Sequence, residues 1–398
     1  MALTSIADRT APPRGSALFS AGFRPFFLLA ALWSALALPL WLFVYTGRVV
    51  LPSALPPVVW HVHEMIHGYA LATVAGFLLT AIPNWTGRLP VRGAPLAMLA
   101  CLWVAGRAAV FFSGMLGAGA TALIDLAFPL AFIAVVAREL IAGRNWKNLT
   151  MLVALSSLFA ANLLVHLQML GMATTAELGN RLGLATILML IALVGGRIVP
   201  SFTRNWLAKV RPKGRLPAQI GRFDLGALLV TGAGLAAWVI EPAGDATSWF
   251  ALAAGVAVAT RLSRWCGLAT LREPIVFILH LGYGWLALGL LLLGINGLHS
   301  LLPPTTALHA LTVGAVGTMT LAVMTRATLG HTGQGLAAGR GTQVIYVLVT
   351  LAALLRLIAP LSGADSINLT WAAGAAWSGA FGLFVAVYGG LLLRPRPT

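Results

Sequence analysis

Charged residues are scarce in this chain. Asp, Glu, Lys and Arg make up 9% of its 398 residues, whereas 59% are hydrophobic. Soluble globular proteins carry roughly 25% charged residues, so the composition excludes an ordinary soluble domain. The net charge of +16 does not indicate nucleic-acid binding, because the basic residues lie in short loops between apolar runs, as the positive-inside rule of membrane proteins requires. The lipid bilayer is the expected partner, and nucleic acid is not.

Cysteine is almost absent as well. The two cysteines, Cys101 and Cys266, are far apart in the chain, which excludes a disulfide framework, a CxxC pair and the CxxCH motif for covalent haem attachment. Neither a Walker A loop nor a dinucleotide-binding fingerprint is found. A cleavable signal peptide is not expected, because no small-residue cleavage site follows the first apolar run. Any haem is therefore expected to be bound non-covalently.

Long apolar runs are abundant. A membrane-spanning helix needs about 20 mostly apolar residues, and about 12 runs reach that length. The sequence therefore predicts an all-α, polytopic integral membrane protein that forms a single membrane domain. A basic, Pro-rich cytoplasmic linker over 201–222 separates helices one to six, about 26–200, from helices seven to twelve, about 223–393. The predicted spans are 26–46, 58–82, 94–113, 118–140, 149–171, 182–200, 223–240, 247–265, 275–297, 305–328, 343–360 and 367–393.

The distribution of Lys and Arg predicts the orientation. These residues gather at both termini and in the loops that follow even-numbered helices, so both termini are predicted to be cytoplasmic. Two six-helix halves are one way to divide the chain. Three pseudo-repeated four-helix units fit about as well, because helices one, five and nine begin at intervals of about 123 and 126 residues.

Histidine is concentrated at one place. Three of the eight histidines, His61, His63 and His67, lie within seven residues at the outer mouth of the second helix. The predicted topology brings His166 and His309 to the same depth, the outer third of the bilayer. Ionisable groups inside a membrane are costly and are functional-site candidates by default. The other charged candidates at this depth are Arg107, Asp125 and Arg356.

Imidazole is a common ligand for haem iron and copper, and its neutral form suits an apolar site. His63 and His67 are four residues apart and so share a helix face, and His63 with His309 best meets the requirements of a bis-histidine haem. Arg107 and Arg356 suit the haem propionates; without haem, they are expected to pair with Asp125 or Glu64. Which histidine binds iron and which binds copper stays open. The candidate metal ligands are His61, His63, His67, His166, His309 and His331, and the candidate cofactor-binding residues are His63, His67, His309, Arg107 and Arg356.

A simpler interpretation of the trio is a polar cap at the membrane surface beneath Trp60. His280 and His299 are expected to make hydrogen bonds between helices. Glu64 is expected to be an interfacial or supporting carboxylate rather than a catalytic acid. No catalytic residue is assigned.

Several long motifs resemble the NnrS family, in order along nearly the whole chain. They are the segments 22–27 (GFRPFF), 60–69 (WHVHEMIHGY), 76–87 (GFLLTAIPNWTG), 196–204 (GRIVPSFTR) and 324–333 (MTRATLGHTG), together with Asn162 and His166. The resemblance implies a 12-helix protein of the bacterial inner membrane that carries haem b and copper and acts in the response to nitric oxide. It does not supply a settled reaction, so enzymatic turnover stays open. Redox activity would require an external electron donor.

Two other functions are compatible with the sequence. One is a proton- or solute-coupled transporter that uses the intramembrane histidines with Arg107, Asp125 and Arg356. The other is a membrane sensor that binds its ligand without turnover.

Overall fold

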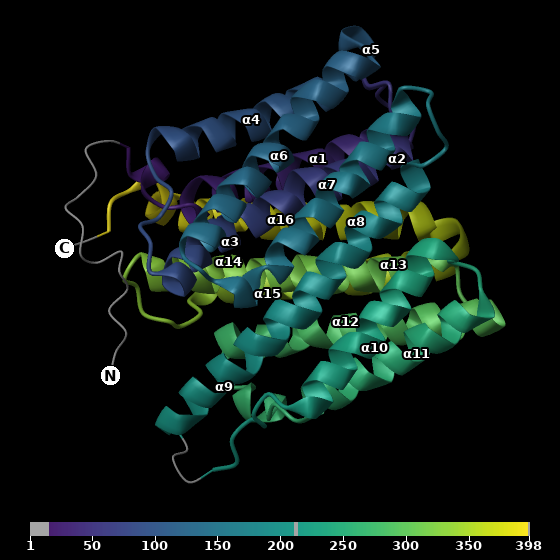
Figure 1. The fold of residues 1–398 in the computed structure, drawn as a ribbon. Helices are drawn as coiled ribbons and strands as arrows, with labels where there is room; N and C mark the ends of the chain where they lie inside the picture. Colours follow the sequence, from purple (N-terminus) through teal and green to yellow (C-terminus); the bar gives the residue numbers. More distant parts are fainter. Residues whose placement is uncertain (1–15, 211–213, 397–398) are drawn as a thin grey trace. The chain divides into compact units, whose positions relative to one another are not determined.

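A computed structural model describes residues 16–210 and 214–396 of the chain (Figure 1). Within these ranges the chain forms helices connected by turns and loops, and it contains no strand. The predicted all-α fold is confirmed. The α-helices are α1 (Phe23–Tyr45), α2 (Pro57–His63), α3 (Leu71–Thr86), α4 (Ala94–Phe111), α5 (Ser113–Leu116), α6 (Ala118–Ala142), α7 (Thr150–Met169), α8 (Ala176–Leu190), α9 (Gly196–Val210), α10 (Arg222–Ile240), α11 (Asp245–Ser263), α12 (Pro274–His299), α13 (Pro304–His309), α14 (Thr318–His331), α15 (Arg340–Ile358) and α16 (Ser366–Leu393).

Eleven helical segments of the described chain are long and apolar enough to cross a membrane, so the chain is a multi-pass membrane protein. The predicted span at 247–265 corresponds to α11, which is not among the eleven. This helix has the same 19-residue length as α10 and packs against both α10 and α12. It is less apolar because Asp245 stands at its start and Arg261 near its end.

The sixth span is longer than predicted. A continuous helical segment runs from Ala176 to Val210, although the sequence predicts a linker after Pro200. Buried residues in its last part recur at helical spacing, namely Gly196, Val199, Pro200, Thr203 and Leu207. One face of the helix therefore packs against protein beyond Pro200, and this packing outweighs the hydrogen bond that the proline removes.

In the described part of the chain, three π-helical segments interrupt the α-helical geometry. They are Glu64–Ala70, Ile191–Gly195 and Ala310–Gly317. Each lies in the second helix of one of the three predicted four-helix units, and His63 and His309 each come directly before one. Because π-helical turns are rare and concentrate at functional sites, their recurrence supports the proposed threefold internal repeat.

The chain forms two compact units. Of the described residues, the first contains 16–183, 327–334 and 385–396, and the second contains 184–210, 214–326 and 335–384. The division falls within α8 rather than in the basic loop.

Small residues allow close helix packing within the first unit, where α1 packs against α3 and α4 against α6 (Figure 1). A Cβ atom at Gly76 of α3 would lie 2.7 Å from the Phe27 ring of α1, so this contact requires glycine. Small residues at helix interfaces are the usual means of close approach in membranes.

Candidate metal centre

The second span places two histidines and a glutamate in the interior of the first unit. His63 ends α2, and the π-helical segment that follows contains Glu64 and His67. All three side chains are buried. The His63 and His67 rings lie with their centroids 5.0 Å apart, so the predicted common face is confirmed. The π-helical geometry also leaves the carbonyl of Gly68 to accept a hydrogen bond of 3.1 Å from the Trp103 indole.

Arg107 of α4 joins two carboxylates. One of its terminal nitrogens donates to both oxygens of Glu64, at 2.8 Å each, and the other donates to Asp125 of α6. Trp33 of α1 donates a further hydrogen bond of 2.7 Å to Glu64. An unpaired charge at this depth would be costly, whereas these ions are paired and hydrogen-bonded. The sequence-based expectation that Arg107 pairs with Asp125 or Glu64 is met by both residues at once.

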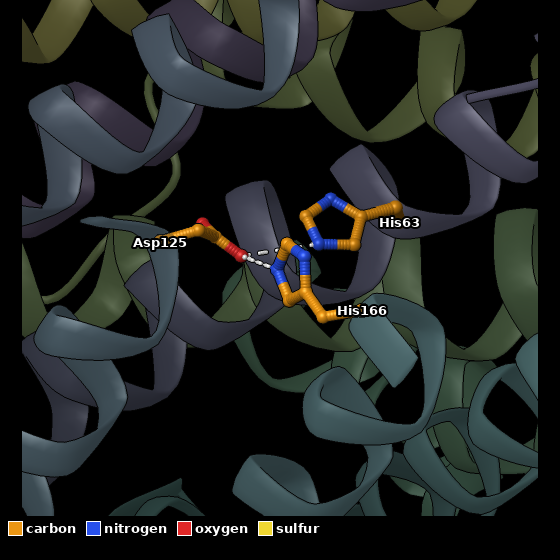
Figure 2. Close-up of side chains that lie close together, drawn as sticks. All are labelled: His63, Asp125 and His166. Carbon is orange, nitrogen blue, oxygen red and sulfur yellow. Dashed lines mark hydrogen bonds and ion pairs between the residues drawn. The ribbon is translucent and has the colours of Figure 1, made fainter. Parts of the chain in front are cut away.

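Asp125 is the centre of the cluster (Figure 2). Its Oδ2 lies 2.9 Å from His166 Nε2 and 3.2 Å from His63 Nε2. Asn162, one turn before His166 on α7, donates to the same oxygen at 2.8 Å, and its own carbonyl oxygen lies 2.8 Å from His63 Nε2. Three helices and the end of α2 thus meet at one level, as the shared depth of these residues predicts.

Three donor residues lie close enough together that they could hold a metal ion. The nearest nitrogen and oxygen atoms of His63, Asp125 and His166 lie within 4.8 Å of one another, and all three residues are buried. An ion held tetrahedrally at about 2.0–2.2 Å keeps its ligand atoms about 3.4 Å apart. The two distances at Asp125 Oδ2, 2.9 and 3.2 Å, are hydrogen-bond lengths somewhat shorter than this value, so a bound ion would separate these atoms slightly.

His67 supplies an independent sign that a ligand belongs here. Its side chain is buried, yet neither ring nitrogen has a hydrogen-bond partner in the described part of the chain. The Nδ1 atom of His166 is also buried without a partner. Buried polar atoms almost always have partners, and an imidazole nitrogen without one is available to a metal ion.

Gly106 of α4 leaves the space that Asp125 occupies. A Cβ atom at this position would lie 2.8 Å from Asp125 Oδ1 and 3.3 Å from the Asp125 Cα atom. Both distances are shorter than ordinary contacts, and the second atom belongs to the backbone. The position of the carboxylate therefore depends on the missing side chain.

We expect Gly106→Ala to lower the free energy of unfolding by about 1–3 kcal/mol, the usual cost of overpacking a well-packed interior. Thermal unfolding in detergent micelles measures the change. Gly119→Ala is the matched control, because no atom lies within 4 Å of a Cβ there and alanine favours a helix. Equal melting temperatures for the two variants would contradict the assigned packing.

Other candidates lie outside this cluster. The His61 ring stacks on Trp41, with centroids 4.1 Å apart, in keeping with an aromatic cap at the helix mouth. His331 ends α14, where its ring packs against Phe23. Neither residue belongs to the group of His63, Asp125 and His166.

His309 and Arg356 belong to the second unit. The Nδ1 atom of His309 donates a hydrogen bond of 2.6 Å to the backbone oxygen of Thr305, which leaves Nε2 as the nitrogen able to bind a metal. Because the two units are described separately, a haem bound between His63 and His309 stays a prediction.

Two carboxylates have more contacts in the site than the sequence predicts. Asp125 was predicted as a counter-charge or as part of a transport path, whereas it contacts two imidazoles. Glu64 was predicted as an interfacial or supporting carboxylate, and it is fully buried. Intramembrane acidic residues are so rare that Asp125, at the depth of the histidines, already carried this signal.

Together, the helices and the cluster define a multi-pass membrane protein with a buried histidine–carboxylate centre suited to a metal ion. The chain belongs to the NnrS family, whose model, described as NnrS protein, matches residues 17–396. A sequence search among curated proteins found no match. Membership of the family supports a role in the response to nitric oxide.

Proposed function

We propose that this chain is a haem- and copper-binding protein of the bacterial inner membrane that binds nitric oxide or protects the cell from it. Copper is assigned to His63, His166 and His67, with Asp125 beside them. The observation that carries the proposal is the buried group of His63, Asp125 and His166 next to an imidazole without a partner. Imidazole nitrogen is a suitable ligand for copper.

Haem b, held non-covalently, is assigned to His309 in the second unit. The hydrogen bond from its Nδ1 atom to Thr305 fixes the tautomer that a haem ligand needs. His309 also directly precedes a π-helical segment, as His63 does. Arg356 on α15 is the proposed partner for a propionate.

The residues around the cluster have defined roles in this proposal. Bound haem and copper supply the redox and nitric-oxide-binding chemistry, and turnover would draw electrons from an external donor. Asp125 orients the His63 and His166 rings, and Arg107 holds Asp125 and Glu64 in place. Trp33 and Trp103 close the site through their indole hydrogen bonds. The side chains of the cluster are buried, so bulk water is kept away from them.

The test is the copper content and the reduced-minus-oxidised spectrum of the purified protein. We expect wild type to contain copper and to show a Soret band. His166→Ala should lower copper by at least about tenfold, the scale of losing a metal ligand or its support, and should keep the Soret band. His309→Ala should lose the Soret band. His299→Ala, an exposed histidine at the end of α12, is the control for both signals.

Protein that lacks both signals in carefully prepared membranes would overturn the proposal. If such protein still moved a solute across the membrane, and His166→Ala abolished this movement, a transporter would be indicated instead. Copper that is unchanged in His166→Ala would reject the ligand assignment alone.

A further inference from the structure

Arg326 of α14, in the second unit, is a cation without an anionic partner. It is partly buried, and its guanidinium carbon lies 4.0 Å from the centre of the Phe202 ring of α9. Among the described residues it has no hydrogen-bond acceptor and no ion pair. Glu273, directly before α12, attracts it without pairing with it. A ring contact does not neutralise the charge, so the N–H donors of the guanidinium remain available to a ligand.

Arg326 lies at the depth of the lipid headgroups. The helical segment Pro304–His331 has 28 residues, which span about 42 Å at 1.5 Å per residue, whereas the hydrocarbon core of a bilayer is about 30 Å thick. The segment ends at His331, five residues after Arg326, on the side where the basic loops gather. The side chain can therefore reach the headgroup layer while its stem stays among the helices.

The helices around Arg326 carry an excess of positive charge. α9 contains two further arginines and a lysine, and neither α9 nor α14 contains an acidic residue. Asp224, a buried acid at the same end of the helices, is already paired with Arg261 and Arg264. An anion from outside the chain would balance the charge of Arg326.

The neighbours of this arginine and of the ring that it contacts are fixed by hydrogen bonds between helices. Thr203, which follows the ring residue, is 0% exposed, and its hydroxyl oxygen lies 2.7 Å from Nε2 of His280 on α12. Thr325, which precedes the arginine, is equally buried, and its hydroxyl oxygen lies 2.7 Å from that of Tyr346 on α15. The backbone is thus held in place on both helices, which lowers the entropy lost when a ligand binds.

We propose that Arg326, supported by Phe202, binds the phosphate of an anionic phospholipid at the predicted cytoplasmic face. The guanidinium fork matches two oxygens of a phosphate group, and basic sites between membrane helices on this side recognise anionic headgroups. The site gives a role to the contact between the segments 196–204 and 324–333, which the metal centre does not use. It does not depend on a bound metal.

The measurement is the melting temperature of the full chain, purified in neutral detergent and freed of lipid, as dioleoyl-phosphatidylglycerol or dioleoyl-phosphatidylcholine is added. Phosphatidylglycerol should raise the melting temperature of wild type in a saturable manner, whereas phosphatidylcholine and inorganic phosphate should have little effect. Arg326→Gln should weaken the apparent affinity for phosphatidylglycerol about tenfold, the scale of losing hydrogen bonds to a charged group. Arg340→Gln is the matched control, because it removes the same charge from an exposed position at the start of α15 and should keep the wild-type affinity.

Phe202→Leu gives a second arm for the case in which Arg326→Gln does not fold. It keeps the charge and an apolar contact but removes the ring face, so the affinity for phosphatidylglycerol should fall about threefold. A third measurement needs no variant. Wild type purified without added lipid should retain phosphatidylglycerol in native mass spectrometry.

Wild-type affinity in Arg326→Gln would overturn the proposal and show that the arginine only packs against the ring. An equal response of wild type to phosphatidylcholine, or to inorganic phosphate, would also overturn it, since the ligand would then be any lipid or a free anion. Copper content and the Soret band should be the same in Arg326→Gln as in wild type. Failure of the lipid site would therefore leave the proposed metal centre in place.

Discussion

Replacing Arg107 with glutamine is expected to lower the free energy of unfolding by about 3–5 kcal/mol, the cost of breaking a buried ion pair. The substitution removes the hydrogen bonds from the guanidinium to Glu64 and Asp125, and it leaves two buried carboxylates without the arginine cation that joins them. Neither carboxylate can turn to water, because Glu64 is 0% and Asp125 1% exposed. Unfolding by urea or heat in detergent micelles measures the loss.

Arg88→Gln is the matched control. Arg88 also pairs with a glutamate, Glu139, at 2.6 Å, but its side chain is 42% exposed. Exposed pairs contribute about 0–1 kcal/mol, so this variant should remain close to wild type. The double variant Glu64→Gln/Arg107→Gln should recover part of the lost stability, because it removes one of the two unpaired charges. Similar losses for Arg107→Gln and Arg88→Gln would show that burial does not decide the energy of the pair.

The number and order of the helices follow from the sequence because a bilayer imposes a minimum length of apolar chain. Hydropathy is less able to predict where a helix ends outside the lipid. The helix of the sixth span continues to Val210 because Thr203 and Leu207 bury one face against protein, and a window of mean hydropathy does not detect a one-sided pattern. The helix α11 has the length expected of a span but a lower mean hydropathy, because Asp245 stands at its start and Arg261 near its end.

The depth of the site could also be predicted, since residue number becomes depth once the orientation of each helix is known. His63, His166, Arg107 and Asp125 were assigned to one level in this way, and the structure brings them into contact. Depth does not give the direction of a side chain around its helix. His61 and His63 are two residues apart, yet one ring stacks on Trp41 and the other contacts Asn162.

The π-helical segments could not be predicted from periodicity, because they change the number of residues per turn locally. The segments nevertheless determine which contacts the neighbouring residues make. The segment after His63 places Glu64 where Arg107 and Trp33 both reach it. In the second unit, the segment Ile191–Gly195 exposes the carbonyl of Ala192 to Arg261, which donates to it at 2.8 Å.

Arg261 is also expected to contribute strongly to the free energy of unfolding. Arg261→Gln is expected to destabilise the protein by about 3–5 kcal/mol. Arg261 is 2% exposed, and its Nε atom donates to Asp224 at 2.8 Å. Its NH1 atom donates to the Ala192 carbonyl and, at 2.9 Å, to the Tyr283 hydroxyl. Loss of the guanidinium leaves a buried carboxylate and a π-helical carbonyl with fewer donors.

Arg264 provides a control on the same carboxylate. It contacts Asp224 at 3.4 Å, but its side chain is 30% exposed, so Arg264→Gln should cost about 1 kcal/mol or less. Arg261→Lys should remain strongly destabilised, because one ammonium group cannot reproduce the separate directions of the guanidinium donors. Full recovery in Arg261→Lys would mean that charge alone stabilises this region. In that case the hydrogen bond to the Ala192 carbonyl would not be what supports the π-helical segment of the sixth span.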